Sequence, residues 1–441
     1  MTHKHFIALL MAAIPIFCMA EVRAYTDVQT DSILRSGKVI FADGHPGTEE
    51  AARQIDSLRR VMAVFYYDQF RHSQEPGMPY FMLMSKDASL TMGLGGVVRM
   101  RGWYDWGGSV DSPAFAPYLI PMQPQSGHIR NIGTTPAGTS LYFRVLGANR
   151  VMGDYQLYIQ ADFSGYQSRG FKLKKAYVNV RDFTIGYAPS TFSDPAALPP
   201  TVDSRGPNNK LSSTNVLVRW MPTFRKHWAV GLSAETPEQA IAVDGSCTAA
   251  ANSWMPDFAA LLQYQWGDHG AQHVRLAGIV RTLTYTDLLA GKARNVAGWG
   301  LLLGSVAHPH PQLTTYATLC YGNGYAGLCG DLALGNYDLV GNPYEPGRMY
   351  APALGGACVA VQYNIRPNLF ISVTGSFSRY CPAHEVAPDE YKYGIYGAAN
   401  MFWNPTPRVQ VGVEFDIARR NNFSGEHRVA KRVGAMCQFS F

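Results

Sequence analysis

The 441-residue sequence lacks several features that would assign it to common classes of protein. Beyond residue 24 it has no run of about 18 apolar residues, which excludes a membrane-spanning helix. It has no basic tract and no base-stacking motif, so its net charge of +6 indicates no nucleic-acid partner. No segment repeats at a fixed length, which disfavours a propeller or a solenoid.

Catalytic and metal-binding motifs are also missing. There is no G-x-S-x-G nucleophile elbow and no phosphate-binding glycine loop. The six cysteines that follow residue 24 have no zinc-binding spacing, so we expect neither a metal site nor a cofactor. Cys320 and Cys329 flank the sequence YGNGYAGL and are candidates for a disulfide. The alternative, that they are only small apolar residues, stays open.

The first 24 residues have the pattern of a secretory signal peptide. Lys4 precedes an apolar run from Phe6 to Met19, and small residues offer cleavage sites after Ala20 or Ala24. We therefore expect residues 1–24 to direct export.

Residues 25–88 predict a periplasmic segment with one short helix. Thr48, followed by two glutamates, is a favourable helix start. Apolar residues then recur at alternating steps of four and three, at Ala51, Ile55, Leu58, Met62 and Phe65. The pattern predicts a helix over 49–68. Whether it packs on its copies, plugs the domain that follows, or lies along the rim stays open.

Residues 89–441 have a period of two. Residues 409–417 place Val, Val, Val, Phe and Ile at odd positions and polar residues or glycine between them. The last strand alternates in the same way and ends on Phe441, which resembles the signal for insertion into the bacterial outer membrane. Segments of about 9–13 residues match tilted membrane strands. The pattern predicts an all-β, antiparallel transmembrane barrel in outer-membrane lipid.

The connections between these segments alternate in length. Short links are expected near 148–152, 181–182, 222–225, 268–272, 309–311, 365–368 and 404–407. Longer links are expected near 107–138, 164–169, 189–213, 235–255, 284–293, 325–354, 381–390 and 420–426. Tight periplasmic turns and longer outside loops are typical of outer-membrane barrels. Seven turns and eight loops predict about sixteen strands, a size that leaves an aqueous channel.

The alternation also assigns charged residues to the inner face. Predicted pore-lining residues are Arg99, Arg101, Asp105, Arg144, Lys172, Lys174, Arg219, Arg275, Arg281, Arg408, Glu414 and Arg432. Cations dominate this set, and a cation-lined passage favours small anionic solutes. The alternative is that these arginines pair with inward acids and only brace the wall. Six tryptophans, Trp103 among them, fall near predicted strand ends and suit interfacial girdles.

The third long link, PSTFSDPAALPPTVDSRGPNNKLSS at 189–213, is the most distinctive segment. Its prolines exclude it from a strand ladder, and its apolar residues are poor choices for an outside loop. It is therefore predicted to fold back and constrict the channel. The predicted constriction residues are Ser190, Thr191, Phe192, Ser193, Asp194, Asp203 and Arg205.

This segment resembles a known family. STFSDPAALPPTVDSRGP, preceded by FTIGYAP and followed by VLVRW, is similar to the constriction-loop signature of the DcaP-like outer-membrane porins. GGVVRMRGWYDWGG and KLKKAYVNV resemble that family's first strands. The resemblance implies a homotrimeric, mostly sixteen-stranded diffusion channel favouring anions such as dicarboxylates. Pro200 departs from the pattern, because an acidic residue is common there.

We therefore predict a passive porin rather than an enzyme. Two alternatives stay open. One is an outer-membrane barrel enzyme, such as a lipase or a protease. The other is a non-conducting barrel that binds a partner through its loops, 107–138 or 325–354.

Overall fold

The structure is a computed structural model, and it describes residues 39–41, 82–84, 90–108, 112–123, 130–149, 151, 153–165, 170–224, 227–267 and 271–441. The expected signal peptide, the expected helix over 49–68 and most of the 25–88 segment lie outside the described residues. Among the described residues, no helix is long and apolar enough to cross a membrane.

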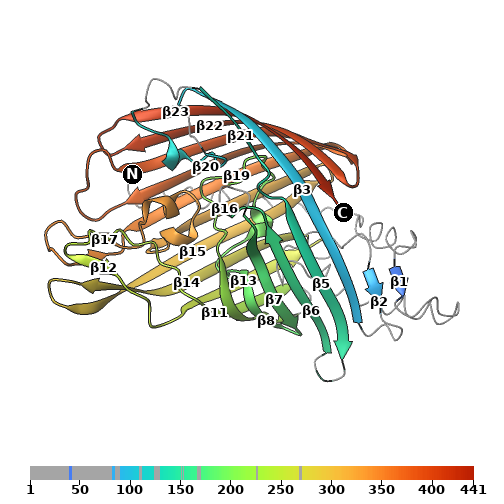
Figure 1. The fold of residues 1–441 in the computed structure, drawn as a ribbon, viewed down its shortest axis with the longest axis horizontal. Helices are drawn as coiled ribbons and strands as arrows, with labels where there is room; N and C mark the ends of the chain where they lie inside the picture. Colours follow the sequence, from blue (N-terminus) through green and yellow to red (C-terminus); the bar gives the residue numbers. More distant parts are fainter. Residues whose placement is uncertain are drawn as a thin grey trace.

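Sixteen of the described strands form a closed antiparallel barrel (Figure 1). In chain order they are β3 (Leu90–Trp106), β5 (Ser140–Asn149), β6 (Gly153–Asp162), β7 (Lys172–Val180), β8 (Phe183–Pro189), β9 (Thr214–Trp220), β11 (Trp228–Glu235), β13 (Asp257–Trp266), β14 (Gln272–Asp287), β15 (Lys292–His310), β16 (Leu313–Asn323), β19 (Ala353–Arg366), β20 (Leu369–Cys381), β21 (Tyr391–Thr406), β22 (Val409–Asn422) and β23 (His427–Ser440). Each pairs with the next, and β23 pairs with β3 to close the ring.

The other described elements are short strands and 3₁₀ turns. They are β1 (Val39–Phe41), β2 (Met82–Met84), β4 (Arg130–Thr135), β10 (Thr223–Phe224), β12 (Thr248–Ala250), β17 (Val340–Gly341), β18 (Met349–Tyr350) and the 3₁₀ turns η1 (Pro117–Leu119), η3 (Pro195–Ala197), η5 (Ala326–Leu328) and η6 (Leu332–Gly335). Strand β3 pairs with β5 through Leu90–Val97 and with β4 through Arg101–Trp106.

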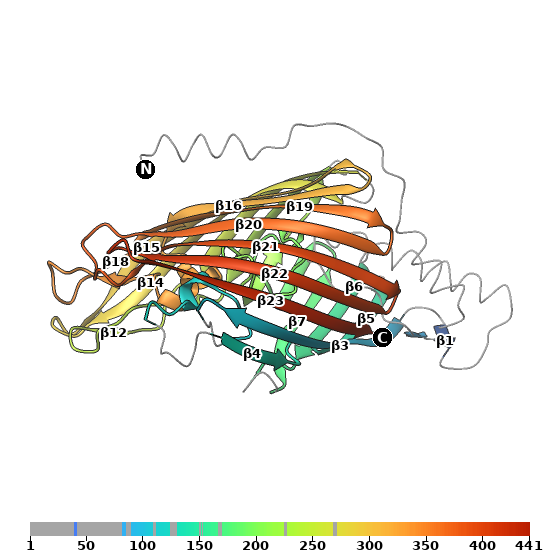
Figure 2. The same cartoon turned by 90° about the horizontal axis from the view of Figure 1, so that it is seen from above.

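The connections lie close to the predicted positions, and most alternate between short turns and long loops. Two links expected to be long, at 284–293 and 420–426, are short turns at 288–291 and 423–426, because the flanking strands extend further than predicted. The long loops gather at one end of the barrel, at the left in Figures 1 and 2, while the C-terminus lies at the other end with β1 and β2. The predicted closed barrel of sixteen antiparallel strands is confirmed.

The outer face of the barrel is apolar and exposed. On β9, the outward Val216 and Val218 are 57% and 50% exposed, whereas the inward Leu217 and Arg219 between them are 2% and 4% exposed. Water would penalise such a belt of exposed apolar side chains, and a lipid bilayer solvates it. Phe441 completes the closure, because its N–H and carbonyl group hydrogen-bond with Gly96 on β3. This architecture places the chain in the bacterial outer membrane.

Two local details differ from a strict alternation of faces. A bulge between β6 and β7 pairs Gln160 with Lys175 but Ala161 with Leu173, so Lys175 joins the inner face beside the buried Gln160. The interpretation of Trp103 as a girdle residue is wrong, because the inward Arg432 guanidinium lies 5.0 Å from the centre of its ring. Trp220, Trp228, Trp299 and Trp403 are exposed on the outer face.

Candidate functional site: loops folded into the barrel

The loop between β8 and β9 lies inside the barrel. Its neck is closed by a hydrogen bond from the Ser190 N–H to the Ser213 carbonyl group, at 3.1 Å. Next to the neck, the buried Glu235 carboxylate accepts the N–H of Thr191 at 2.8 Å. Four prolines interrupt the loop and it forms no strand of its own, so most of its backbone polar groups bond with side chains of the wall or with other loops.

One wall of the barrel holds the first half of this loop. Asp194 is buried and contacts His273 Nε2 at 2.8 Å and Arg275 Nη1 at 3.7 Å. Burial by itself raises the pKa of Asp194, but Arg275 and His273 outweigh it and lower the pKa to about 2. Phe192, also fully buried, packs edge-on against Tyr325 with ring centres 6.0 Å apart. The first half of the loop is therefore fixed against β14 and its neighbours.

Strands β20, β21 and β22 hold the second half. The Asp203 N–H donates to Glu414 Oε1 on β22 at 2.6 Å. The Asn400 amide on β21 donates to the Pro200 carbonyl oxygen at 2.8 Å, and the Asn208 N–H donates to Ser376 Oγ on β20 at 3.2 Å. Because its neck lies at β8 and β9 and its second half is attached to β21 and β22 on the other side of the ring, the loop crosses the lumen.

Two further loops join it, which the sequence reasoning missed. In the loop after β3, the Phe115 N–H donates to Asp203 Oδ1 at 3.0 Å. In the loop after β16, the Gly330 N–H donates to the Lys210 carbonyl oxygen at 2.8 Å, and Asp331 Oδ1 accepts the Tyr118 N–H at 3.0 Å. The sequence does contain a sign that these two loops fold inward. Both carry apolar residues although links of this kind are expected to face water, and these residues are buried: Phe115, Ile120, Tyr325, Leu328, Leu332 and Leu339.

Several of the predicted pore-lining cations are buried and bonded to the wall or to these loops. Arg432 makes a bidentate contact with Asp105 at 2.6 and 2.9 Å. Arg281 lies 2.9 Å from Asp257 and 3.1 Å from Asp338. These residues brace the structure. The others in this group are Arg275, which donates to the Ser193 carbonyl oxygen, Arg219, which donates to the Pro189 carbonyl oxygen, and Arg144, which lies over the Tyr158 ring.

A second group of cations is partly exposed on the inner face. We call it the basic cluster, and it comprises Arg99, Arg101, Lys174, Lys175, Arg205 and Lys210. Lys174, Arg101 and Arg205 lie close enough to Lys210 for their positive charges to lower its pKa. Lys174 in turn lies near Arg99 and Lys175. Strands β3 and β7 and the loop that crosses the lumen thus bring these side chains to one region.

Carboxylates also lie near the cluster, among them Asp162, Asp203, Glu414 and Asp331. Lys174 contacts Asp162 at 3.3 Å, yet its side chain stays 46% exposed. Arg99 bonds to the neutral Gln438 at 2.8 Å. Burial lowers the pKa of Lys210, and the positive charges of Lys174 and Arg101 lower it further against the effect of Asp203. The cluster therefore gathers six partly exposed or exposed cations in one region of the inner face.

The remaining predicted residues are placed as follows. Lys172 is exposed on the inner face opposite Asp162, whereas Arg408 lies in the turn between β21 and β22 and not in a strand. Ser190, Thr191 and Ser193 are buried near the loop neck, and Arg205 donates to the Gly330 carbonyl oxygen at 3.2 Å. Sequence reasoning missed Lys175, which the bulge turns inward, and Lys210.

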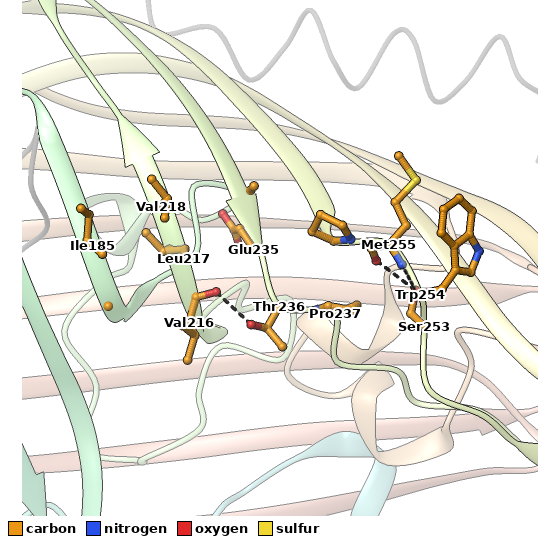
Figure 3. Close-up of a pocket in the computed structure, with 13 residues that line it drawn as sticks. Ile185, Val216, Leu217, Val218, Glu235, Thr236, Pro237, Ser253, Trp254 and Met255 are labelled. Carbon is orange, nitrogen blue, oxygen red and sulfur yellow. Dashed lines mark hydrogen bonds between the residues drawn. The ribbon is translucent and has the colours of Figure 1, made fainter.

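A groove of about 370 Å³ lies on the outer wall rather than in the passage (Figure 3). It runs along the exposed Ile185, Val216 and Val218 and is bordered by the segment that carries Trp254. Its apolar lining and its place on the lipid-facing surface separate it from the basic cluster. We assign it no role in solute passage.

Comparison with known proteins supports the fold. No family model matches the sequence, and no curated protein matches it. The solved outer membrane channel DcaP of Acinetobacter baumannii has a TM-score of 0.68 at 18% identity, covering 80% of this chain and 98% of that one. An anion-selective porin from Comamonas acidovorans has a TM-score of 0.53 at 8% identity, covering 80% and 100%. The chain thus has the fold of outer-membrane porins and resembles the DcaP channel.

Proposed function

We propose that this chain is a passive diffusion channel of the outer membrane that favours small anionic solutes of the dicarboxylate type. The basic cluster carries the proposal, because cations that are gathered on the inner face and stay partly exposed lower the barrier for an anion. No bond is made or broken, and transport follows the concentration gradient.

The division of the cations supports this proposal. Arg432, Arg281, Arg275 and Arg219 are buried and bonded to acids or backbone carbonyl groups, so they hold the wall and the loops. Arg99 and Arg101 are two positions apart on β3, so both face inward, and Lys174 lies close to Arg99. Guanidinium groups bind carboxylates in a planar, bidentate manner, and two carboxylates on one solute can engage neighbouring cations. The loop that crosses the lumen would set the size limit.

Two similarities point the same way. The constriction-loop segment resembles that of the DcaP-like porins, which implies dicarboxylate preference. The Comamonas protein of similar fold is described as anion-selective.

The test is ion selectivity and solute passage by the purified protein. In a planar bilayer with a potassium chloride gradient, the reversal potential should favour chloride over potassium. Proteoliposomes should then take up succinate faster than the neutral, similarly sized butane-1,4-diol. A reversal potential that favours potassium would contradict the anion preference while leaving the channel intact.

The proposal extends to export and assembly. Residues 1–24 would be removed as a signal peptide, and residues 25–88 would form a periplasmic segment whose helix supports a homotrimer. Crosslinking of the protein with and without residues 25–75 tests this part. A trimer band that is unchanged by the deletion would contradict the role of the helix in assembly.

One observation favours a second candidate function. Three loops pack together inside the barrel, as a plug would, and this is expected of a non-conducting barrel that binds a partner. Absence of any conductance from correctly folded protein would favour that candidate over a porin.

A further inference from the structure

Two thiols meet inside the barrel where three segments come together. Cys320 faces inward from β16 and is 1% exposed, and Cys329 follows η5 and is fully buried. Both sulfurs contact Oδ1 of Asn209, at 2.9 Å from Cys320 and 3.8 Å from Cys329. Strand β16, the loop that follows it and the lumen-crossing loop therefore meet at Asn209.

The surroundings fix the position of both sulfurs. The Tyr325 hydroxyl donates to Cys320 Sγ at 3.3 Å. The backbone of Cys329 forms a β-bridge with Leu211, and its carbonyl oxygen accepts the Ala333 N–H at 2.8 Å. Because both sulfurs contact the same oxygen atom, they lie near each other, as a crosslink requires.

We propose that Cys320 and Cys329, whose thiols are free in the structure, are joined by a disulfide in the mature protein. An exported chain crosses the periplasm, where protein disulfides oxidise thiols. The thiolate of one cysteine attacks the oxidant's disulfide and forms a mixed disulfide. The second thiolate displaces the oxidant as its dithiol, so two protons and two electrons leave the pair and one S–S bond forms.

Chain separation and burial favour formation before the barrel closes and persistence afterwards. The two cysteines are only nine positions apart, so they meet readily in the unfolded chain. Once the barrel has formed, both are buried and soluble thiols cannot reach the bond. The crosslink would fasten the loop after β16 to the wall. Through Leu211 and Asn209 it would also hold the end of the lumen-crossing loop.

Thiol mapping of the full-length protein from outer membranes tests the bond. The protein is denatured with an alkylating reagent, without reductant, and digested for mass spectrometry. Cys320 and Cys329 should resist alkylation until a reductant is added, and their linked peptide should be two hydrogens lighter than the free peptides. Cys437, on the outer face, should be alkylated at once. Quantitative alkylation of both cysteines, or a link from Cys320 to Cys358, would overturn the proposal.

The fastening role has a separate readout that does not depend on conductance. In Cys329→Ser, trypsin should cleave after Lys210 several-fold faster than in the wild type, because the loop end loses its covalent anchor. Cys437→Ser is the matched control and should retain wild-type protection. If Cys329→Ser and Cys320→Ser both fold and remain as resistant as wild type, the disulfide does not fasten the loop.

Discussion

Arg275 on β14 donates a hydrogen bond from Nη1 to the carbonyl oxygen of Ser193 at 2.7 Å. A cation that the alternation of faces assigns to the lumen is therefore used to hold the lumen-crossing loop. Its Nε also donates to Gln263 Oε1 at 2.8 Å, which fixes the guanidinium against the wall.

Removing this anchor should release the loop. Arg275→Ala deletes the bond to Ser193 and leaves the buried Asp194 with His273 as its remaining ionisable partner, at a cost of roughly 3–5 kcal/mol. Loop movement should widen the passage, so single-channel conductance should rise and become noisier. Arg275→Lys retains the charge without the planar fork and should show a smaller effect. Unchanged conductance in folded Arg275→Ala would mean that this loop does not limit passage.

The same loop should respond to a single methyl group. A Cβ at position 300 would lie 2.7 Å from the tip of the Phe192 ring, so Gly300→Ala must displace that fully buried side chain. Overpacking of this kind costs about 1–3 kcal/mol. Urea or guanidinium unfolding in detergent should show the loss, and the conductance should change. Gly375→Ala, where a Cβ meets nothing within 4 Å, is the control. Equal effects in both variants would contradict the packing argument.

Charge reversal should separate the basic cluster from cations elsewhere. Arg99→Glu combined with Arg101→Glu should move the reversal potential towards potassium, since both side chains are partly exposed on the inner face. Lys292→Glu makes the same kind of change at an exposed position at the loop end of β15, and it should leave selectivity near the wild-type value. Similar shifts in both proteins would show that overall charge, and not the cluster, sets selectivity.

Asp331 should make the inward loops sensitive to pH. Burial raises its pKa from 3.8 to about 6, against the hydrogen bonds from Tyr118 and Tyr391. The folded state therefore binds this proton more tightly than the unfolded chain. The stabilisation is fully present below pH 3.8 and is lost as the pH rises through about 6.

The matched variant is Asp331→Asn, which has no charge to titrate. Its stability relative to wild type should increase between pH 4 and 7 by roughly 2–3 kcal/mol. Denaturant unfolding in detergent at several pH values measures this difference. Asp244→Asn is a control of opposite sign, because hydrogen bonds from Thr248 and Cys247 lower the pKa of Asp244. A pH-independent difference for Asp331→Asn would contradict the assignment.

The barrel could be predicted from the sequence because its determinants are local. Alternation along a strand such as 409–417 is set by lipid on one side and the lumen on the other, and link lengths follow from tight turns and outside loops. All fifteen links between the sixteen wall strands overlap the ranges that the sequence predicts, although two expected long loops are short turns.

The site was less predictable because it depends on contacts between distant segments. The alternation along a strand assigns a side chain to the inner or the outer face, but it does not show whether an acidic residue on another strand lies within contact distance. Arg432 bonds to Asp105, which is 327 positions away, whereas the Arg99 side chain bonds to the neutral Gln438. The bulge that turns Lys175 inward changes the register without any proline or glycine to mark it.

The most direct test of the account is the zero-current potential of the wild-type protein in a bilayer that separates two concentrations of potassium chloride. The sign should be that of chloride permeating faster than potassium, and added succinate should reduce the chloride current. A folded protein that conducts potassium in preference, or that passes no current at all, would contradict the central claim that the partly exposed basic cluster guides anions past the inward loop.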